Sequence, residues 1–520
     1  MRLRTAGSKL RMSVAARAEA AAPRRHKSVA VIGAGAAGLV AARELRKENM
    51  EVTVFERGSE VGGTWVYNDG SKRGGESCSS SGNGDGDGGG HHIHSSLYDN
   101  LRVNLPREIM GYSDYSFGKE ASAEAGFSRD GRRYCHHSEV LYYLRSFAQK
   151  FGLEDLVQRD TLVEKAEPLL GGGVGDGGGA GWRLTLNRKG RSEREEGVFD
   201  ALVVCNGHFE VPRKPRNLAG AAFLGAQMHS RDYKRSDAEV FRGKNVLVVG
   251  TGPSGDDLSR EVSAVAENVY WSGRLFKRID AAKLGRIQES VAENVHLRPN
   301  IAKVAEDGRT VHFECQGGGD NSSAFAPVAV DTILWCTGYE YAVPFLDGRE
   351  VGVSTAQGRI EPLYEHLFHP KFGASLSFIG LGFKILPFPH FEIQAAWVAR
   401  CLAGKCTLPT EQEMAERARA FYDGFGEAAG PGAPAVEYTH CMDGIQWSYL
   451  QSISDQPGME GAAHLPPWKR EMYDVNRKKK GLHPTEYRDL VLEEELPLIQ
   501  VGLEEVARSN NPPVPSSNLM

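Results

Sequence analysis

Short apolar runs that lead into glycine-rich turns set the organisation of this chain. Residues 29–32 and 246–249 are each followed by such a turn and then by a helical pattern. The next strand-like runs are residues 52–55 and 268–271, one after each helical pattern. Strands that alternate with helices predict an α/β fold with parallel sheets. Because the pattern occurs twice, we expect two Rossmann-like dinucleotide-binding domains.

The two turns read GAGAAG at residues 33–38 and GTGPSG at residues 250–255. A GxGxxG turn between a strand and a helix lets the backbone approach a pyrophosphate, and the helix N-terminus favours the negative charge of that group. A single turn of this kind is weak evidence, because glycine-rich turns are common. Two of them, each between a strand and a helix, predict two dinucleotide sites.

The residues after the second strand of each unit differ in charge. Glu56 directly follows the strand of the first unit, where a carboxylate suits the ribose hydroxyls of an unphosphorylated adenosine. The second unit has Ser272, Gly273 and Arg274 at the equivalent distance, and a cation there suits the extra phosphate of NADP. We therefore predict that the first unit binds FAD and that the second binds NADPH.

Two further apolar runs, 199–204 and 330–335, each end in a small-residue turn where the chain changes domain. The NADPH domain is accordingly expected to be inserted in the FAD domain. Helical spacing of apolar residues predicts one helix at 138–150 and another at 391–402, whose N-terminus we expect to point toward the flavin. The predicted parts are the first part of the FAD domain at 28–211, the NADPH domain at 212–330 and the second part of the FAD domain at 331–490.

The ends of the chain and two inserts lack a packing pattern. Residues 1–27 contain eight Lys or Arg and one acid, a composition that resembles an organelle transit peptide but equally fits a disordered basic tail. The localisation therefore stays open between the cytoplasm and an organelle, either chloroplast or mitochondrion. Residues 68–92 and 171–181 are glycine-rich and predict surface loops. Residues 491–520 are acidic and then rich in Pro, Ser and Asn, which predicts a disordered tail.

Composition excludes several other classes of protein. The net charge of −5 argues against nucleic acid as a partner. The eight cysteines include no CxxC pair, which argues against a disulfide reductase, and no metal-ligand spacing, so no metal site is expected. No apolar run approaches the roughly 20 residues of a transmembrane span.

A resemblance to a known family rests on residues between and around the two turns. Phe223, Gly225, His229 and Tyr233 resemble the FxGxxxHxxxY fingerprint of the flavin-containing monooxygenases, although His229 alone would be taken as a structural histidine. The related Baeyer–Villiger enzymes are similar but have a tryptophan at the last position. Three longer stretches resemble plant members, and especially the thioether-oxidising glucosinolate S-oxygenases. They are LYDNLRVNLPREIMGYSDYSF at 97–117, LPFPHFEIQAAWVARCLAGKCTLPT at 386–410 and HPTEYRDL at 483–490.

The resemblance implies that the protein is an NADPH-dependent flavin monooxygenase with FAD as its second cofactor. Reduced FAD would trap O2 as a C4a-hydroperoxyflavin and oxygenate a sulfur or nitrogen atom of a small-molecule substrate. Asn104 would lie beside the flavin ring and the nicotinamide as the catalytic positioning residue, with Tyr339 and Trp65 as walls of the site. The residues expected to bind the cofactors are Gly33, Ala34, Gly35, Ala36, Ala37, Gly38, Glu56, Gly63, Thr64, Trp65, Asn104, Gly250, Thr251, Gly252, Pro253, Ser254, Gly255 and Arg274.

Two other functions stay open at this stage. The same flavin chemistry supports oxidative decarboxylation of a 2-oxo acid, and a third hypothesis is a catalytically silent sensor that binds NADPH. The intact glycines, Glu56, Arg274 and Asn104 argue against the silent sensor. The sequence does not identify the substrate, nor does it decide whether the chain forms a homo-oligomer.

Overall fold

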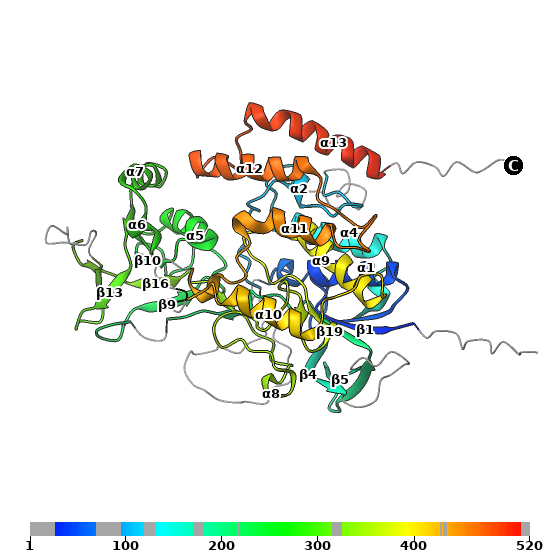
Figure 1. The fold of residues 1–520 in the computed structure, drawn as a ribbon. Helices are drawn as coiled ribbons and strands as arrows, with labels where there is room; N and C mark the ends of the chain where they lie inside the picture. Colours follow the sequence, from blue (N-terminus) through cyan, green and yellow to red (C-terminus); the bar gives the residue numbers. More distant parts are fainter. Residues whose placement is uncertain are drawn as a thin grey trace, which may run out of the picture.

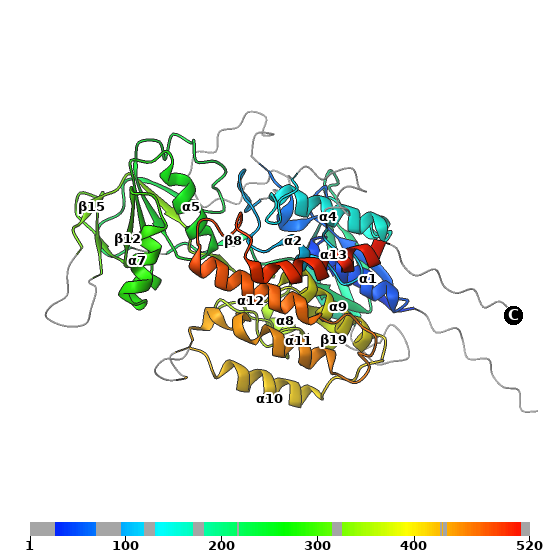
Figure 2. The same cartoon turned by 90° about the horizontal axis from the view of Figure 1, so that it is seen from above.

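In a computed structural model of the protein, two α/β lobes lie side by side (Figures 1 and 2). The residues that the structure describes are 26–68, 95–118, 130–169, 181–215, 218–314, 325–426, 429 and 434–510. The predicted basic tail at 1–27 and the glycine-rich inserts at 68–92 and 171–181 fall almost wholly outside these ranges. Among the described residues, no helix combines the length and apolar character needed to cross a membrane.

The first lobe is built on a six-stranded sheet that is parallel except for one edge strand. Every residue of its central strands β1 and β7 is buried, because the sheet is covered on both faces. In spatial order the strands are β18 (Phe368–His369), β19 (Gly373–Phe378), β7 (Ala201–Val204), β1 (Ser28–Ile32), β2 (Glu51–Phe55) and β3 (Val157–Gln158).

Helices cover one face of this sheet and a smaller sheet covers the other. Helix α1 (Ala36–Lys47) packs against α9 (Pro387–Leu402), most of whose residues are buried, and α4 (His137–Lys150) joins the same core. Helix α9 begins four residues before the predicted 391, because prolines are well tolerated in the first turn of a helix. The opposite face packs against an antiparallel sheet that was not predicted, formed by β4 (Thr161–Leu169), β5 (Gly181–Arg188) and β6 (Glu195–Phe199).

The second lobe, green in Figure 1, has a five-stranded parallel sheet. Strands β10 and β11 pair in parallel just as β1 and β2 do in the first lobe. In spatial order the strands are β12 (Val295–Arg298), β11 (Asn268–Ser272), β10 (Asn245–Val249), β16 (Thr332–Trp335) and β9 (Ala226–His229). The lobe also contains α5 (Pro253–Ser263), α6 (Leu275–Arg278), α7 (Ala281–Glu289) and a small sheet of β13 (Ile301–Val304), β14 (Thr310–Phe313) and β15 (Val328–Ala329). Two Rossmann-type domains are thereby confirmed.

The chain passes from the first lobe to the second and back through two short paired strands. Strand β8 (Val211–Pro212) leads into the second lobe, β17 (Tyr339–Glu340) leads out of it, and the two pair antiparallel. The predicted boundary at 330 is too early, because β16 still belongs to the second sheet, where it pairs with β10 and β9. The inserted segment therefore extends through Trp335.

The last part of the chain is helical and lies over the first lobe in Figure 2, with one end beside the second lobe. The prediction of a disordered tail at 491–520 is wrong for residues 493–510, because α13 runs over Leu496–Asn510 after a 3₁₀ turn at Glu493–Glu495. That turn is held by Glu495, whose buried carboxylate accepts hydrogen bonds from Lys479 and Arg133. The remaining helices are α2 (Arg107–Met110), α8 (Gly348–Val351), α10 (Glu411–Tyr422), α11 (Gln446–Ser454) and α12 (Pro467–Leu482).

Candidate active site

The first glycine turn joins β1 to α1 and leaves the start of that helix open. Gly33 has a φ of +101°, and a β-carbon there would lie 2.5 Å from the carbonyl oxygen of Cys205, so the position requires glycine. Gly35 is the N-cap of α1, and the first helical turn has neither a side-chain cap nor an acidic residue. Unpaired backbone N–H groups and the positive end of the helix dipole therefore remain available for an anion.

Glu56 lies at this turn, as predicted. Its Oε2 atom accepts a hydrogen bond from the N–H of Ala34 at 2.8 Å, and its Oε1 atom accepts one from the N–H of Gly58 at 2.7 Å. The carboxylate is buried at the end of β2. The structure thus brings together the acid and the glycine turn that the sequence predicted for adenosine.

The turn that contains Trp65 closes over the same glycines. The N–H of Gly62 donates to the carbonyl oxygen of Ala34 at 2.9 Å, and the 3₁₀ turn Gly63–Trp65 follows directly. Gly63 and Thr64 are exposed, and the Thr64 hydroxyl lies 3.2 Å from that of Ser96. The two glycine-containing turns therefore lie against each other.

The second glycine turn repeats this geometry between β10 and α5. Gly250 has a φ of +125°, and a β-carbon there would lie 2.2 Å from the carbonyl oxygen of Cys336. A β-carbon at Gly252, the N-cap of α5, would meet nothing within 4 Å. The acid in the first helical turn is Asp256, and it forms an ion pair with Arg260 at 3.2 Å. The open space at Gly252 fits the approach of a pyrophosphate.

Arg274 follows β11 and lies beside this second turn. A β-carbon on the preceding Gly273 would lie 2.7 Å from Cγ2 of Thr251, so the two segments are in close contact. The Arg274 side chain is 55% exposed, and its carboxylate partner, Glu437, is 3.7 Å away. Lys277, in contrast, forms an ion pair with Glu314 at 3.3 Å. Arg274 is therefore exposed and only weakly paired, which fits the predicted contact with a phosphate.

Asn104 lies in residues 98–105, the Asn104 segment, whose Tyr98 packs into the hydrophobic core of the second lobe. It is exposed, and its carbonyl oxygen accepts a hydrogen bond from Nδ2 of Asn476 at 3.3 Å. Its side-chain amide forms no hydrogen bond with the residues that the structure describes, so the structure joins it to neither glycine turn. Trp65 is partly buried in the first lobe. Tyr339 is partly buried on β17, where the chain leaves the second lobe.

Of the FxGxxxHxxxY residues, His229 contacts the segment by which the chain returns to the first lobe. His229 donates from Nε2 to the carbonyl oxygen of Gly338 at 3.1 Å, while its Nδ1 accepts from the N–H of Arg231. Burial lowers the pKa of His229 to about 4, so the ring is neutral. Tyr339 packs on His229 with a ring separation of 5.3 Å, and burial raises its pKa to about 12. His229 is thus a structural residue, which is how this histidine is interpreted from the sequence when it is considered without the rest of the motif.

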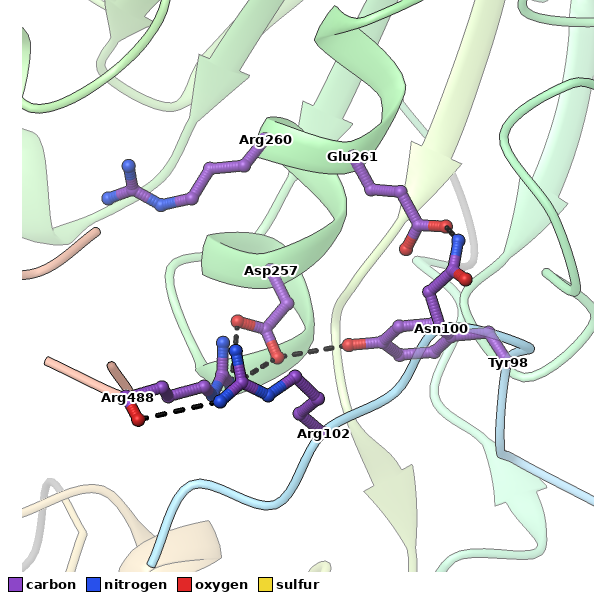
Figure 3. Close-up of a pocket in the computed structure, with 7 residues that line it drawn as sticks. All are labelled: Tyr98, Asn100, Arg102, Asp257, Arg260, Glu261 and Arg488. Atoms are coloured by element: carbon purple, nitrogen blue, oxygen red, sulfur yellow. Dashed lines mark hydrogen bonds and ion pairs between the residues drawn. The ribbon is translucent and has the colours of Figure 1, made fainter. Parts of the chain in front are cut away.

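A polar pocket between the lobes contains residues that the sequence did not single out (Figure 3). Asp257, on α5, accepts hydrogen bonds from Tyr98 and from Arg488. A signal was present in the sequence, since Asp257 follows the GxGxxG turn by two residues and Arg488 belongs to the HPTEYRDL stretch. What the sequence could not show is that these residues meet.

Two nucleotide-binding lobes with open helix N-termini define the class of two-dinucleotide flavoprotein oxidoreductases. The chain belongs to the flavin-containing monooxygenase family, since a family model described as flavin-binding monooxygenase-like matches residues 26–290 and 287–446. It is an NADPH-dependent flavin monooxygenase with FAD and NADPH as cofactors, which confirms the resemblance seen in the sequence.

Relatives and solved structures match almost the whole chain. Flavin-containing monooxygenase FMO GS-OX-like 3 of Arabidopsis thaliana is 37% identical over 91% of this chain and 96% of its own length. FMO GS-OX5 of the same plant is 40% identical over 83% of this chain and 85% of its own length. The structure of S-allyl-L-cysteine S-oxygenase from Allium sativum matches with a TM-score of 0.76 and 34% identity, covering 93% of this chain and 99% of that one.

Proposed function

We propose that this protein transfers one oxygen atom from O2 to the thioether sulfur of a small molecule. The observation that carries the proposal is the 34% identity to the Allium S-oxygenase across 93% of this chain. The GS-OX-like relatives support the same choice of sulfur over nitrogen. Each glycine turn leads into a helix whose N-terminus has no side-chain cap, which supports binding of a pyrophosphate there.

In this proposal each of the two lobes binds a different cofactor. Residues 33–38, Glu56 and the turn at Gly63–Trp65 hold FAD, and residues 250–255 with Arg274 hold NADPH. The chemistry that the bound cofactors supply is transfer of hydride from NADPH to flavin and activation of O2 by the reduced flavin. The protein orients both cofactors, excludes water and supplies Asn104 as a neutral hydrogen-bond donor.

The test is NADPH consumption by the purified protein with three groups of compounds, namely thioethers such as S-allyl-L-cysteine, tertiary amines and 2-oxo acids. We expect a thioether to give sulfoxide in proportion to the NADPH consumed. Carbon dioxide release from a 2-oxo acid without sulfoxide formation would favour oxidative decarboxylation instead. Binding of NADPH without oxidation in the presence of any of these compounds would favour the silent sensor.

A further inference from the structure

Asp257 connects the NADPH-side helix to the first lobe. It lies on α5 just after the glycine turn, and its carboxylate accepts a hydrogen bond from the Tyr98 hydroxyl at 2.9 Å. Nη2 of Arg488 donates to both carboxylate oxygens, at 3.0 and 2.8 Å (Figure 3). Although burial by itself would lower the pKa of Arg488, the Asp257 carboxylate raises it, so the guanidinium stays charged.

Arg488 also holds the peptide that precedes Asn104. Its Nε atom donates to the carbonyl oxygen of Val103 at 3.2 Å, and the N–H of Val103 donates to the carbonyl oxygen of Cys135 at 2.9 Å. One guanidinium therefore binds α5 on one side and the Asn104 segment on the other. The planar guanidinium group of arginine can donate to both partners at once, whereas the single ammonium group of lysine cannot reach both in this geometry.

We propose that Arg488 is a positioning residue that fixes the NADPH-binding helix relative to the Asn104 segment. Asp257 and Tyr98 are its partners, and together they join three parts of the chain that lie far apart in sequence. The inference rests on the proposed binding of NADPH at residues 250–255. Because hydride transfer depends on the alignment of donor and acceptor, a small rotation of α5 lowers the rate while leaving the phosphate contacts in place.

A neighbouring ion pair provides a matched control. Lys480, on α12, forms an ion pair with Asp256 at 3.3 Å, so it joins the same C-terminal region to the same helix. It makes no hydrogen bond with the Asn104 segment among the residues that the structure describes. Loss of Lys480 thus removes one ionic contact between the C-terminal region and α5 but leaves the bridge through Arg488 intact.

The experiment compares Arg488→Gln, Arg488→Lys and Lys480→Gln with the wild type as full-length FAD-loaded protein. We expect Arg488→Gln to slow anaerobic flavin reduction at saturating NADPH by about ten-fold or more. The dissociation constant for NADP+, measured by calorimetry, should change by less than about three-fold, because the phosphate contacts remain. Arg488→Lys should resemble Arg488→Gln, and Lys480→Gln should stay close to wild type.

Hydrogen exchange of the FAD-loaded protein without NADPH gives a readout that is independent of turnover. Amides in residues 98–105 should exchange faster in Arg488→Gln than in Lys480→Gln. Equal exchange and equal reduction rates in these two variants would overturn the inference. If Arg488→Gln does not fold, Tyr98→Phe keeps the ring and removes one bond to Asp257, and it should give a smaller change in the same direction. If NADPH does not reduce the wild-type flavin, the proposed function fails, and the exchange data alone decide whether Arg488 holds the segment.

Discussion

Gly35 and Gly63 approach so closely that a β-carbon on Gly63 would lie 2.8 Å from the Cα of Gly35. The first of these residues caps α1, and the second begins the turn that contains Trp65. The site proposed for FAD therefore has no room for a side chain at Gly63, which also has a φ of +57°.

Replacement of Gly35 by leucine is expected to abolish retention of flavin. A β-carbon at Gly35 already lies 3.4 Å from the Cα of Gly63, and the rest of the side chain would occupy the place of the pyrophosphate. The measurement is flavin absorbance per protein after purification. Gly285→Leu is the control, because a β-carbon on this glycine of α7 meets nothing within 4 Å. Normal flavin content in Gly35→Leu would remove the assignment of the first lobe to FAD.

Arg274→Ala should reduce the preference for NADPH over NADH. A charge-assisted contact to phosphate contributes about 1.5–3 kcal/mol, and solvent exposure places this one near the low end. The expected fall in the ratio of kcat/KM for the two cofactors is therefore about ten-fold. Lys277→Ala is the control, since Lys277 has its own partner in Glu314. If only Lys277→Ala or Arg278→Ala changes the ratio, the phosphate is bound one helical turn further on.

Asn104→Asp should retain FAD but lose oxygenation of a thioether. The change places a negative charge near the reduced flavin, which is unfavourable in a site that excludes water. Oxidation of NADPH should then yield hydrogen peroxide instead of sulfoxide. Sulfoxide and peroxide formed per NADPH consumed are the quantities to measure. Asn104→Ser, which keeps a neutral donor, should retain more of the sulfoxide yield. An unchanged sulfoxide yield in Asn104→Asp would show that this residue only shapes the turn.

Glu495→Gln should destabilise the fold by about 3–5 kcal/mol, because it leaves the buried charge of Lys479 without its partner. Both side chains of this ion pair are fully buried, and Glu495 also binds Arg133. The adjacent Glu494 forms an ion pair with exposed Lys478 and is the matched control. Glu494→Gln should cost less than about 1 kcal/mol. Free energies of unfolding from denaturant titration compare the two variants, and equal losses would contradict the role of the buried pair.

Stability should fall in mild acid because of buried neutral histidines. His390 is fully buried, neither of its ring nitrogens has a hydrogen-bond partner among the described residues, and burial lowers its pKa to about 3. Burial lowers the pKa of His366 and His208 to about 4 as well. An unfolded histidine binds its proton near pH 6.5. As the pH falls from there toward 4, these histidines are protonated in the unfolded state but not in the folded state, so the free energy of unfolding decreases.

His390→Leu is expected to weaken this pH dependence. Because its folded pKa is about 3, His390 contributes a slope that approaches about 1.4 kcal/mol per pH unit between pH 6 and pH 4, and the variant should lose this contribution. Unfolding by urea at several pH values measures the slope, with the same substitution at exposed His464 as the control. An identical slope in His390→Leu and wild type would show that this histidine is already protonated in the folded protein.

The sequence predicted those parts of the site whose contacts form within a single strand–helix–strand unit. Glu56 meets the first glycine turn because the length of a strand–helix–strand unit fixes that spacing. The bridge through Arg488 could not be predicted, since Asp257 is 231 residues away in the chain. The disorder predicted from residue 491 onward rests on an acidic, then Pro-, Ser- and Asn-rich composition, which does not show that Glu495 is buried beside distant cations or that Leu498 and Ile499 pack on a core cluster.

The insertion of the second lobe also fixes the order in which the chain can fold during synthesis. All five strands of the inserted sheet lie between residues 226 and 335, so they leave the ribosome as one continuous segment. The first sheet can be completed only later, because β19, which pairs with β7, is synthesised about 170 residues after it. Until then the hydrogen-bonding edge of β7 is open, and an early stop just after the inserted lobe would leave an unfinished first sheet beside a complete second one.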